Sequence, residues 1–319
     1  MDTPARILII KLSALGNVVL SLGPFAAIRA HHPNAEITVL TTPAYAGWLA
    51  NAPWFDHVIR DGRPPWWDFR GMMRLRRTLR AQGFDRVYDL QTSGRSSRYF
   101  RFFPRDARPE WCGIAAGCSH PHRMPPGTWM HDIDRQYAQL AVAGITERAP
   151  VDLSWSSGDV ARFDLPERFA LLVPGSSAHR PGKRWPVARY GELAGILRAR
   201  GIVPVVAGTR DEAPLGAAIL AVTPGAIDLT GQTTLPELTE LTRLAVCAIG
   251  NDTGPMHLAA AAGCPSVVLF SRDSDPALCA PRGRWVRTLR ESDLAQLSLQ
   301  AVTDALPDLD CAALQAPTT

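Results

Sequence analysis

Residues 246–270 read VCAIGNDTGPMHLAAAAGCPSVVLF, and this stretch places a polar turn and a helix-favouring segment between two apolar runs. The apolar runs predict buried strands, and Pro255 suits the first position of a helix that can end at Gly263. Strand, turn, helix and strand in this order form half of a doubly wound parallel sheet. The stretch therefore predicts an α/β fold.

The predicted helix begins where a strand ends, which is the edge at which ligands of open α/β sheets bind. Its free N–H groups and the positive end of its dipole favour an anion. Asp252 and Thr253 stand at this point. They either contact a ligand or cap the helix, because both residue types are common N-caps.

Composition indicates a globular protein with an anionic ligand. The chain has 319 residues, enough for two domains of roughly 150 residues each. A hydrophobic content of 46% with 20% charged residues excludes a disordered chain. The net charge of +4 favours anionic ligands but is too small to require nucleic acid, which we do not expect as a partner.

Cysteine usage and the amino terminus both indicate a cytoplasmic protein. The six cysteines form no C-x-x-C pair, so we expect reduced thiols and neither a zinc site nor a disulfide framework. The chain begins MDTPARILIIK, which has no signal-peptide layout. No apolar run approaches the ~20 residues that span a bilayer, so any contact with the inner face of the inner membrane is expected to be peripheral.

The two halves of the chain repeat one pattern. Residues 6–40 predict strand, loop, helix (18–30) and strand, and residues 169–207 predict the same order. We therefore expect two Rossmann-like domains facing a cleft, at 1–155 and 156–319. Further predicted segments are helices at 43–50, 70–80 and 131–143, strands at 55–59 and 86–90, and a loop at 112–126.

Two loops of the second half carry groups suited to a nucleotide. After a strand, PGSSAHRPGKRW at 174–185 offers Ser176, Ser177, Lys183 and Arg184, a plausible cradle for a diphosphate. Neither a Walker A loop nor G-x-G-x-x-G is present. In AGTRDE at 207–212, a carboxylate could accept hydrogen bonds from a ribose diol or could cap the next helix.

The first half is rich in arginine. Residues 70–80 read RGMMRLRRTLR, which is either a solvated helix face or a basic surface for a phosphorylated or membrane-bound partner. Arginines then alternate with aromatic residues at 95–105, a mixture that could bind an acidic acceptor or belong to a core. His120 and His122 lack a third nearby ligand, so we expect no metal there.

Several motifs together resemble the ADP-heptose:lipopolysaccharide heptosyltransferase family, glycosyltransferase family 9. They are KLSALGN, VPGSSAHRPGKRWP, AGTRDE, DLTGQTTLPEL and above all GNDTGPMHLAAAAGCP, and the likeness extends over residues 6–289. The resemblance implies a glycosyltransferase-B fold, with the acceptor on the first domain and an ADP-sugar on the second. In resembling folds the last helix crosses back to the first domain, and the sequence leaves open whether residues after 298 do so.

The resemblance also assigns residues. On the donor side it implies a diphosphate-binding loop, a ribose-binding acid and a nucleotide-sugar motif, matched here by Ser176, Ser177, Lys183, Glu212, Asp252, Thr253, Gly254 and His257. Candidates for acceptor binding are Ser13, Asn17, Arg95, Arg98 and His122. As catalytic residues we expect Lys183, Asp252, Asn17 and Asp89.

One position departs from the family. Its first loop usually ends in Gly-Asp, whose Asp is the proposed base, but this chain has Gly16 and Asn17. An amide cannot take up the acceptor's proton, and a general base typically contributes ~100- to 10,000-fold. Asp89, on a neighbouring strand end, is the first substitute, with His120 and His122 behind it.

The expected function is therefore inverting, metal-independent transfer of a heptose from ADP-heptose to a lipopolysaccharide core acceptor. No cofactor is expected, because the ADP-sugar is a substrate, and we expect a monomer. Asp273 and Asp275 spell D-x-D, but a turn role is favoured over metal binding. The alternatives are a UDP- or GDP-sugar transferase or epimerase, and a non-catalytic nucleotide-sugar-binding protein motivated by Asn17.

Overall fold

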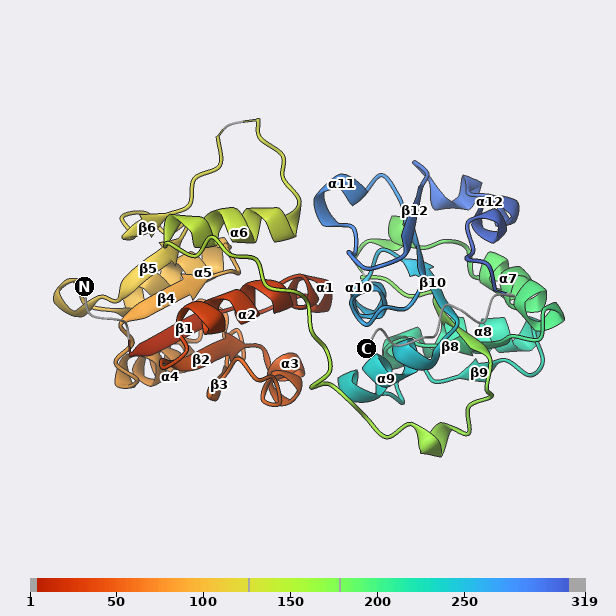
Figure 1. The fold of residues 1–319 in the computed structure, drawn as a ribbon, viewed down its shortest axis with the longest axis horizontal. Helices are drawn as coiled ribbons and strands as arrows, with labels where there is room; N and C mark the ends of the chain where they lie inside the picture. The colour runs from red at the N-terminus through yellow and green to blue at the C-terminus, as the bar shows by residue number, and fades with distance from the viewer. Residues whose placement is uncertain (1–4, 126, 178, 310–319) are drawn as a thin grey trace. The chain divides into compact units, whose positions relative to one another are not determined.

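The computed structural model describes residues 5–125, 127–177 and 179–309, and it consists of two compact α/β units (Figure 1). The division falls between Trp155 and Ser156. Each unit contains a six-stranded sheet in which all strand pairs are parallel. The sequence prediction of two parallel-sheet α/β domains is confirmed.

The sheet of the first unit has the strand order β3-β2-β1-β4-β5-β6. Its strands are β1 (Arg6–Ile10), β2 (Glu36–Thr41), β3 (His57–Arg60), β4 (Arg86–Asp89), β5 (Glu110–Gly113) and β6 (His120–Pro121). Its helices are α1 (Leu15–Val19), α2 (Leu22–His31), α3 (Pro43–Leu49), α4 (Phe69–Ala81), α5 (Gly94–Tyr99) and α6 (Asp132–Val142). Leu75 and Leu79 of α4 pack with Leu8 and Ile10 of β1 in one buried cluster.

Two sequence predictions for this unit were wrong. The helix expected at 18–30 is divided into α1 and α2, because Pro24 has no N–H and fits the first turn of a helix that begins at Leu22. The loop expected at 112–126 contains β6, in which His120 pairs with Cys112 of β5. A two-residue strand has no periodicity that a sequence could display.

The second unit repeats the topology, with the order β12-β11-β10-β7-β8-β9. Its strands are β7 (Phe169–Val173), β8 (Val203–Val206), β9 (Ile227–Asp228), β10 (Cys247–Asn251), β11 (Ser266–Phe270) and β12 (Val286–Arg290). Its helices are α7 (Val187–Ala199), α8 (Ala213–Val222), α9 (Leu235–Leu244), α10 (Gly254–Ala261), α11 (Pro276–Cys279) and α12 (Leu299–Asp304). Numbered within each unit, both sheets have the doubly wound order 3-2-1-4-5-6.

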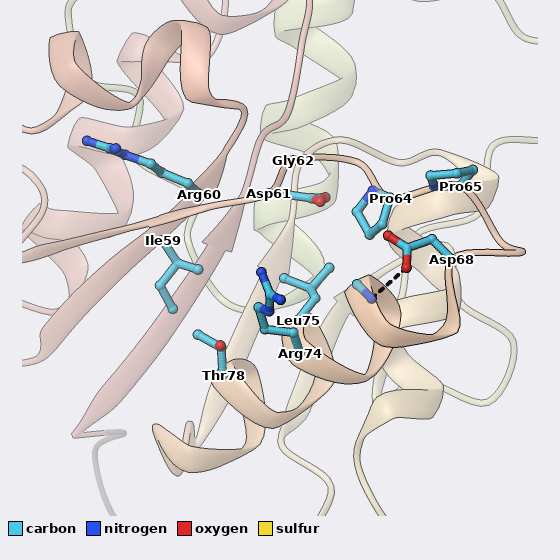
Figure 2. Close-up of a pocket in the computed structure, with 11 residues that line it drawn as sticks. Ile59, Arg60, Asp61, Gly62, Pro64, Pro65, Asp68, Arg74, Leu75 and Thr78 are labelled. Atoms are coloured by element: carbon cyan, nitrogen blue, oxygen red, sulfur yellow. Dashed lines mark hydrogen bonds between the residues drawn. The ribbon is translucent and has the colours of Figure 1, made fainter.

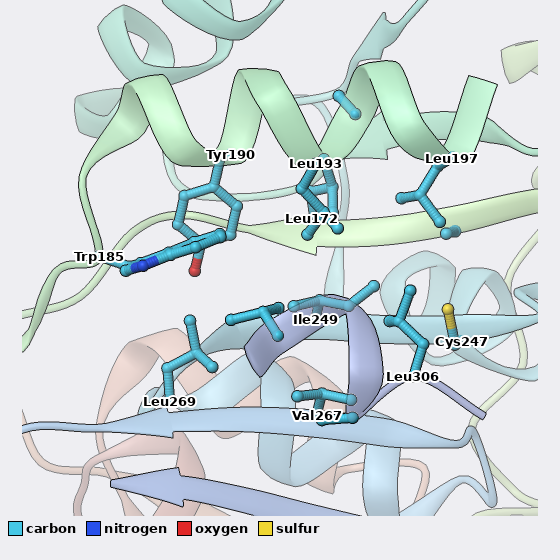
Figure 3. Close-up of a cluster of buried hydrophobic side chains, with 14 of the residues drawn as sticks. Leu172, Trp185, Tyr190, Leu193, Leu197, Cys247, Ile249, Val267, Leu269 and Leu306 are labelled. Atoms are coloured by element: carbon cyan, nitrogen blue, oxygen red, sulfur yellow. The ribbon is translucent and has the colours of Figure 1, made fainter. Parts of the chain in front are cut away.

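One face of the second sheet is covered by α7 and α12. Figure 3 shows Tyr190, Leu193 and Leu197 of α7 pointing toward the strands, where Ile249 belongs to the same buried cluster. Leu306, which follows α12, belongs to this cluster as well. The last described helix is therefore part of the second unit's core, and residues 310–319 lie outside the described residues.

Four buried cysteines, Cys112, Cys118, Cys247 and Cys264, carry free thiols. Cys279 is half-buried at the end of α11, and Cys311 lies outside the described residues. No helix in the described ranges has both the length and the apolarity that a bilayer crossing requires.

Candidate functional site

The strongest candidate site lies at the carboxyl ends of β7 and β10. These strands are neighbours in the second sheet, and the direction in which successive strands are added to the sheet changes between them. The Nζ of Lys183 lies 2.6 Å from the Oδ2 of Asp252, and the two side chains are only 12% and 8% exposed. Lys183 comes from the loop after β7, and Asp252 follows β10 directly. The ion pair thus spans the reversal point, where ligands of such sheets bind.

Asp252 is held in its charged form. Burial alone raises its pKa, but His257 and the ammonium group of Lys183 outweigh burial and lower the pKa to about 2. The Nε2 of His257 lies 3.8 Å from the Oδ1 of Asp252, which is too long for a strong hydrogen bond. His257 is buried, and its Nδ1 has no hydrogen-bond partner among the described residues.

The amino terminus of α10 opens at the same place. Thr253 occupies the N-cap position, but its side chain accepts no capping hydrogen bond, and the carboxylate of Asp252 binds Lys183 instead. Side-chain capping, which the sequence left open for both residues, is therefore not their role. Gly250 allows α10 to pack this closely, since a Cβ there would lie 2.7 Å from Met256 and from Val173.

Asn251 was not among the residues predicted from sequence. It is fully buried, and its Nδ2 donates to the carbonyl oxygens of Pro174 (2.8 Å) and Gly175 (3.3 Å). Its Oδ1 accepts from the backbone N–H of Trp185 (3.0 Å) and from the hydroxyl of Tyr190 (3.1 Å). One amide therefore fastens both ends of the loop that carries the predicted diphosphate-binding residues.

That loop holds Ser176 and Ser177 differently. Ser176 is buried, and Arg184 donates to its hydroxyl (3.3 Å) and to its carbonyl oxygen (3.0 Å). Ser177 is exposed. The sequence suggested Arg184 as part of a diphosphate cradle. In the structure its guanidinium group is bound to Ser176 and stabilises the loop.

Of the two roles that the sequence left open for the acid of this loop, Glu212 has the capping role in the structure. Its Oε2 accepts from the backbone N–H (2.7 Å) and the hydroxyl (3.1 Å) of Thr209, which forms a capping box. The carboxylate lies against Gly175, where a Cβ would overlap it. Its Oε1 accepts no hydrogen bond within the described ranges, so this oxygen is available to a ligand beside the loop after β7.

In the first unit, Ser13 lies in the loop after β1, and Asn17 lies on the helix α1 that follows it. The Oε1 of Gln91 accepts from the backbone N–H groups of Leu12 (2.8 Å) and Ser13 (3.2 Å), which fixes this loop to the end of β4. The hydroxyl of Ser13 accepts from Arg63 at 3.3 Å. Asn17 lies half-buried on α1. Gln91 was not among the site residues predicted from the sequence, because its contacts with a loop about 80 residues away follow no local motif.

Asp89, at the end of β4, is fully buried. Burial raises the pKa of its carboxyl to about 7, and hydrogen bonds from Ser96 and the Thr92 backbone oppose this only in part. Its Oδ2 has no hydrogen-bond partner in the described part of the chain. Nearby Lys11 is also buried, and burial lowers the pKa of its ammonium group to about 8.

Arg95 and Arg98 lie together on α5, over the ring of Trp66, at 4.9 Å and 4.6 Å from its centroid. Arg95 also donates to the carbonyl oxygen of Pro64 at 3.1 Å and to the hydroxyl of Tyr99 at 3.3 Å. Arg98 forms neither an ion pair nor a hydrogen bond within the described residues. It is therefore the freer cation of the two.

His120, His122 and the D-x-D residues belong to no three-ligand cluster within the described residues. No cluster of three His, Cys, Asp or Glu side chains that could hold a metal occurs in the described ranges. His122 is buried, and burial together with the charge of Arg135 lowers its pKa. Asp275 caps α11 by accepting from the N–H of Ala277 at 3.0 Å, which is the turn role that the sequence favoured.

Comparison with known proteins agrees with this geometry. The sequence model of glycosyltransferase family 9 (heptosyltransferase) matches residues 72–300. The chain belongs to glycosyltransferase family 9. The match contains every donor-side candidate together with Asp89, Arg95, Arg98 and His122, whereas Ser13 and Asn17 precede it.

Relatives that this family 9 chain matches over nearly its whole length include lipopolysaccharide heptosyltransferases. Lipopolysaccharide heptosyltransferase 2 of Salmonella typhimurium is 27% identical over 338 residues, covering 95% of each chain. The Escherichia coli protein of the same name matches at the same identity and coverage. The chain is accordingly a glycosyltransferase of the heptosyltransferase type.

Solved structures show the same fold as this family 9 chain. The E. coli ADP-heptose lps heptosyltransferase II superposes with a TM-score of 0.76 at 25% identity, covering 97% of this chain and 98% of that one. The E. coli heptosyltransferase WaaC with ADP gives a TM-score of 0.75 at 21% identity, covering 94% and 98%. The glycosyltransferase-B fold implied by the motifs is thereby confirmed.

Proposed function

We propose that this chain transfers a heptose from ADP-heptose to a lipopolysaccharide core acceptor, with inversion at the anomeric carbon. The Lys183–Asp252 pair beside the amino terminus of α10 is the observation that carries the proposal, because it sets a fixed cation at a helix end suited to a diphosphate. The names of the relatives supply the sugar and the acceptor.

On the donor side, Lys183 stabilises the charge that develops on the departing diphosphate. An ammonium group has three donors, so binding to Asp252 leaves two for phosphate oxygens. The N–H groups that open at Gly254, the exposed hydroxyl of Ser177 and the half-buried hydroxyl of Thr253 add donors. Such groups accelerate the reaction when they bind the leaving group more strongly in the transition state than in the ground state.

Glu212 and His257 complete the donor site. The Oε1 of Glu212 accepts from the ribose diol, while its Oε2 remains in the capping box with Thr209. His257 contacts the sugar nucleotide through Nδ1, the ring nitrogen without a partner in the described chain. Transfer needs no metal, because the cationic and N–H groups supply the required charge.

On the acceptor side, Ser13, Asn17 and His122 contact the sugar, and Arg98 with Arg95 binds its anionic groups. Asn17 orients the attacking hydroxyl. A carboxyl with a pKa near 7 is a competent base, but Asp89 is fully buried, so proton transfer to it requires the groups that cover it to move. The enzyme acts as a monomer in the cytoplasm, at the inner face of the inner membrane.

Asn17 also favours a second candidate, a non-catalytic protein that binds a nucleotide sugar. Calorimetric titration with ADP, UDP and GDP in a chelator, followed by mass spectrometry of acceptor incubated with ADP-heptose, separates the candidates. We expect preference for ADP and a heptosylated product. Preference for UDP or GDP contradicts the proposed donor, loss of binding in the chelator contradicts metal independence, and binding without product supports the second candidate.

A further inference from the structure

The outer face of α4 carries arginine and methionine without any carboxylate. The helix sequence FRGMMRLRRTLRA has five arginines, and its exposed side includes Arg70, Met73, Arg74 and Arg77. These positions are three or four residues apart, so they form one continuous stripe along the helix. Leu75 and Leu79 on the opposite side are buried in the core.

The charge of this stripe is not neutralised by the protein. None of Arg70, Arg74 and Arg77 forms an ion pair or hydrogen bond within the described residues. Between residues 62 and 84 the sequence has a single acid, Asp68, and its carboxylate caps α4 by accepting from the N–H of Gly71 at 2.9 Å. A helix that faces only water usually interleaves both signs of charge.

Large apolar side chains lie exposed at the start of the same helix. Trp67 is 79% exposed and Phe69 is 77% exposed, while Met73 continues the apolar surface one turn later. Exposed aromatic residues beside a cationic helix face are typical of segments that lie in the interfacial region of a bilayer.

A pocket of about 440 Å³ adjoins the stripe (Figure 2). It lies between the end of β3 and α4, and Arg60 and Arg74 are among its lining residues. The carboxylate of Asp61, also in the lining, is satisfied by the N–H of Arg63 (2.7 Å) and the hydroxyl of Tyr99 (2.6 Å). Arg74 has no ion pair in the described chain, whereas the side chain of Arg60 extends away from α4 (Figure 2). The pocket therefore adds only Arg74 to the cationic face of the helix.

We propose that α4 and the residues just before it bind the surface of an anionic phospholipid bilayer. The α4 docking surface is formed by Trp67, Phe69, Arg70, Met73, Arg74 and Arg77. The arginines contact lipid phosphates and the aromatic side chains enter the headgroup region, which matches both the charge and the exposed apolar area. The inference does not depend on the proposed sugar transfer, because vesicle binding is measured without any sugar substrate.

Flotation with vesicles tests this surface. We expect the chain to bind vesicles with 30% phosphatidylglycerol and not vesicles of phosphatidylcholine alone. Each arginine near an anionic surface contributes about 5-fold, so R70Q/R74Q/R77Q weakens binding roughly 100-fold at low salt. W67A/F69A weakens it at high salt as well, because apolar insertion is not screened.

Two matched controls confine the effect to α4. R189Q/R198Q/R200Q removes the same net charge from the second unit, and W129A removes a tryptophan that is 80% exposed in the loop before α6. Both should bind vesicles like the unaltered chain, with unchanged circular dichroism. Equal binding to neutral vesicles, or equal losses in the controls, overturns the proposal. So does a dimer that W67A/F69A dissociates, because the surface then binds a second copy.

Discussion

Lys183 and Asp252 are 69 residues apart in the sequence, yet Nζ and Oδ2 approach within 2.6 Å in a setting where both side chains are nearly buried. A buried pair of this kind has two separable effects. It places a cation where a diphosphate can bind, and it keeps a carboxylate charged away from water. Each effect has its own measurement.

Lys183→Ala should lower kcat by about 100- to 1,000-fold, the range typical of losing one group that stabilises developing negative charge. The variant should also lose about 3–5 kcal/mol of unfolding free energy at pH 7, because Asp252 is left buried without its partner. Transfer assays and urea unfolding measure the two effects.

The double variant K183M/D252N separates these effects. Replacing both charges by uncharged groups of similar size should restore most of the stability but none of the activity. Unchanged turnover in K183A removes Lys183 from the mechanism.

Asn17→Asp should raise kcat by about 100-fold, the lower end of what a general base contributes. The change adds a carboxylate at the position where the family usually has its proposed base. Asn51→Asp, at an exposed position of the same unit, is the matched control. If turnover of N17D equals that of the unaltered enzyme, the base lies elsewhere and Asp89 becomes the first residue to test.

Asp89→Asn should remove a pH dependence of stability. Burial raises the folded-state pKa from 3.8 to about 7, so the folded protein binds the proton more tightly than the unfolded chain. The contribution of Asp89 to the unfolding free energy is therefore greatest below pH 4 and falls as the pH rises to 7, by at most about 4 kcal/mol. Urea unfolding between pH 4 and 8 measures this fall.

The D89N variant should lack that fall, whereas exposed Asp106→Asn should retain it. If the unaltered protein and D89N show the same change of unfolding free energy between pH 4 and 7, Asp89 does not have a raised pKa in the folded state.

Asn251→Ala should weaken both folding and ADP binding. It leaves two carbonyl oxygens and one N–H without partners, and each unsatisfied buried group costs about 1–3 kcal/mol. The hydroxyl of Tyr190 keeps only its longer contact with the carbonyl oxygen of Val173 (3.4 Å). Asn251→Asp should weaken ADP binding most at neutral pH, because a carboxylate then faces the carbonyl oxygens of Pro174 and Gly175. ADP binding by this variant should be stronger at pH 4, where the protonated acid can donate a hydrogen bond to one of these oxygens. Calorimetry with ADP at both pH values tests this, and equal affinity in N251A contradicts it.

The sequence predicted the parts of this protein that depend on local pattern. Apolar runs identified β7 and β11, and the turn before Pro255 located the start of α10 to within two residues. It could not show that Asp252 binds Lys183 instead of capping α10, because that choice depends on a loop 69 residues away. Asn251 escaped notice for the same reason, since its four partners come from the loop after β7 and from α7. Asp89 was chosen for its place at a strand end, but its complete burial is a property of the packed unit.

Gln91 and Asn251 occupy corresponding places in the two units. Gln91 lies just after β4 and binds the loop after β1, and Asn251 is the last residue of β10 and binds the loop after β7. Gln91 does so as an acceptor, and Asn251 mainly as a donor. Each of the two ligand-facing loops is therefore already ordered before any substrate arrives. The conformational entropy of these loops is therefore lost when the protein folds and not each time a substrate binds. More of the binding free energy then remains for discriminating one sugar from another.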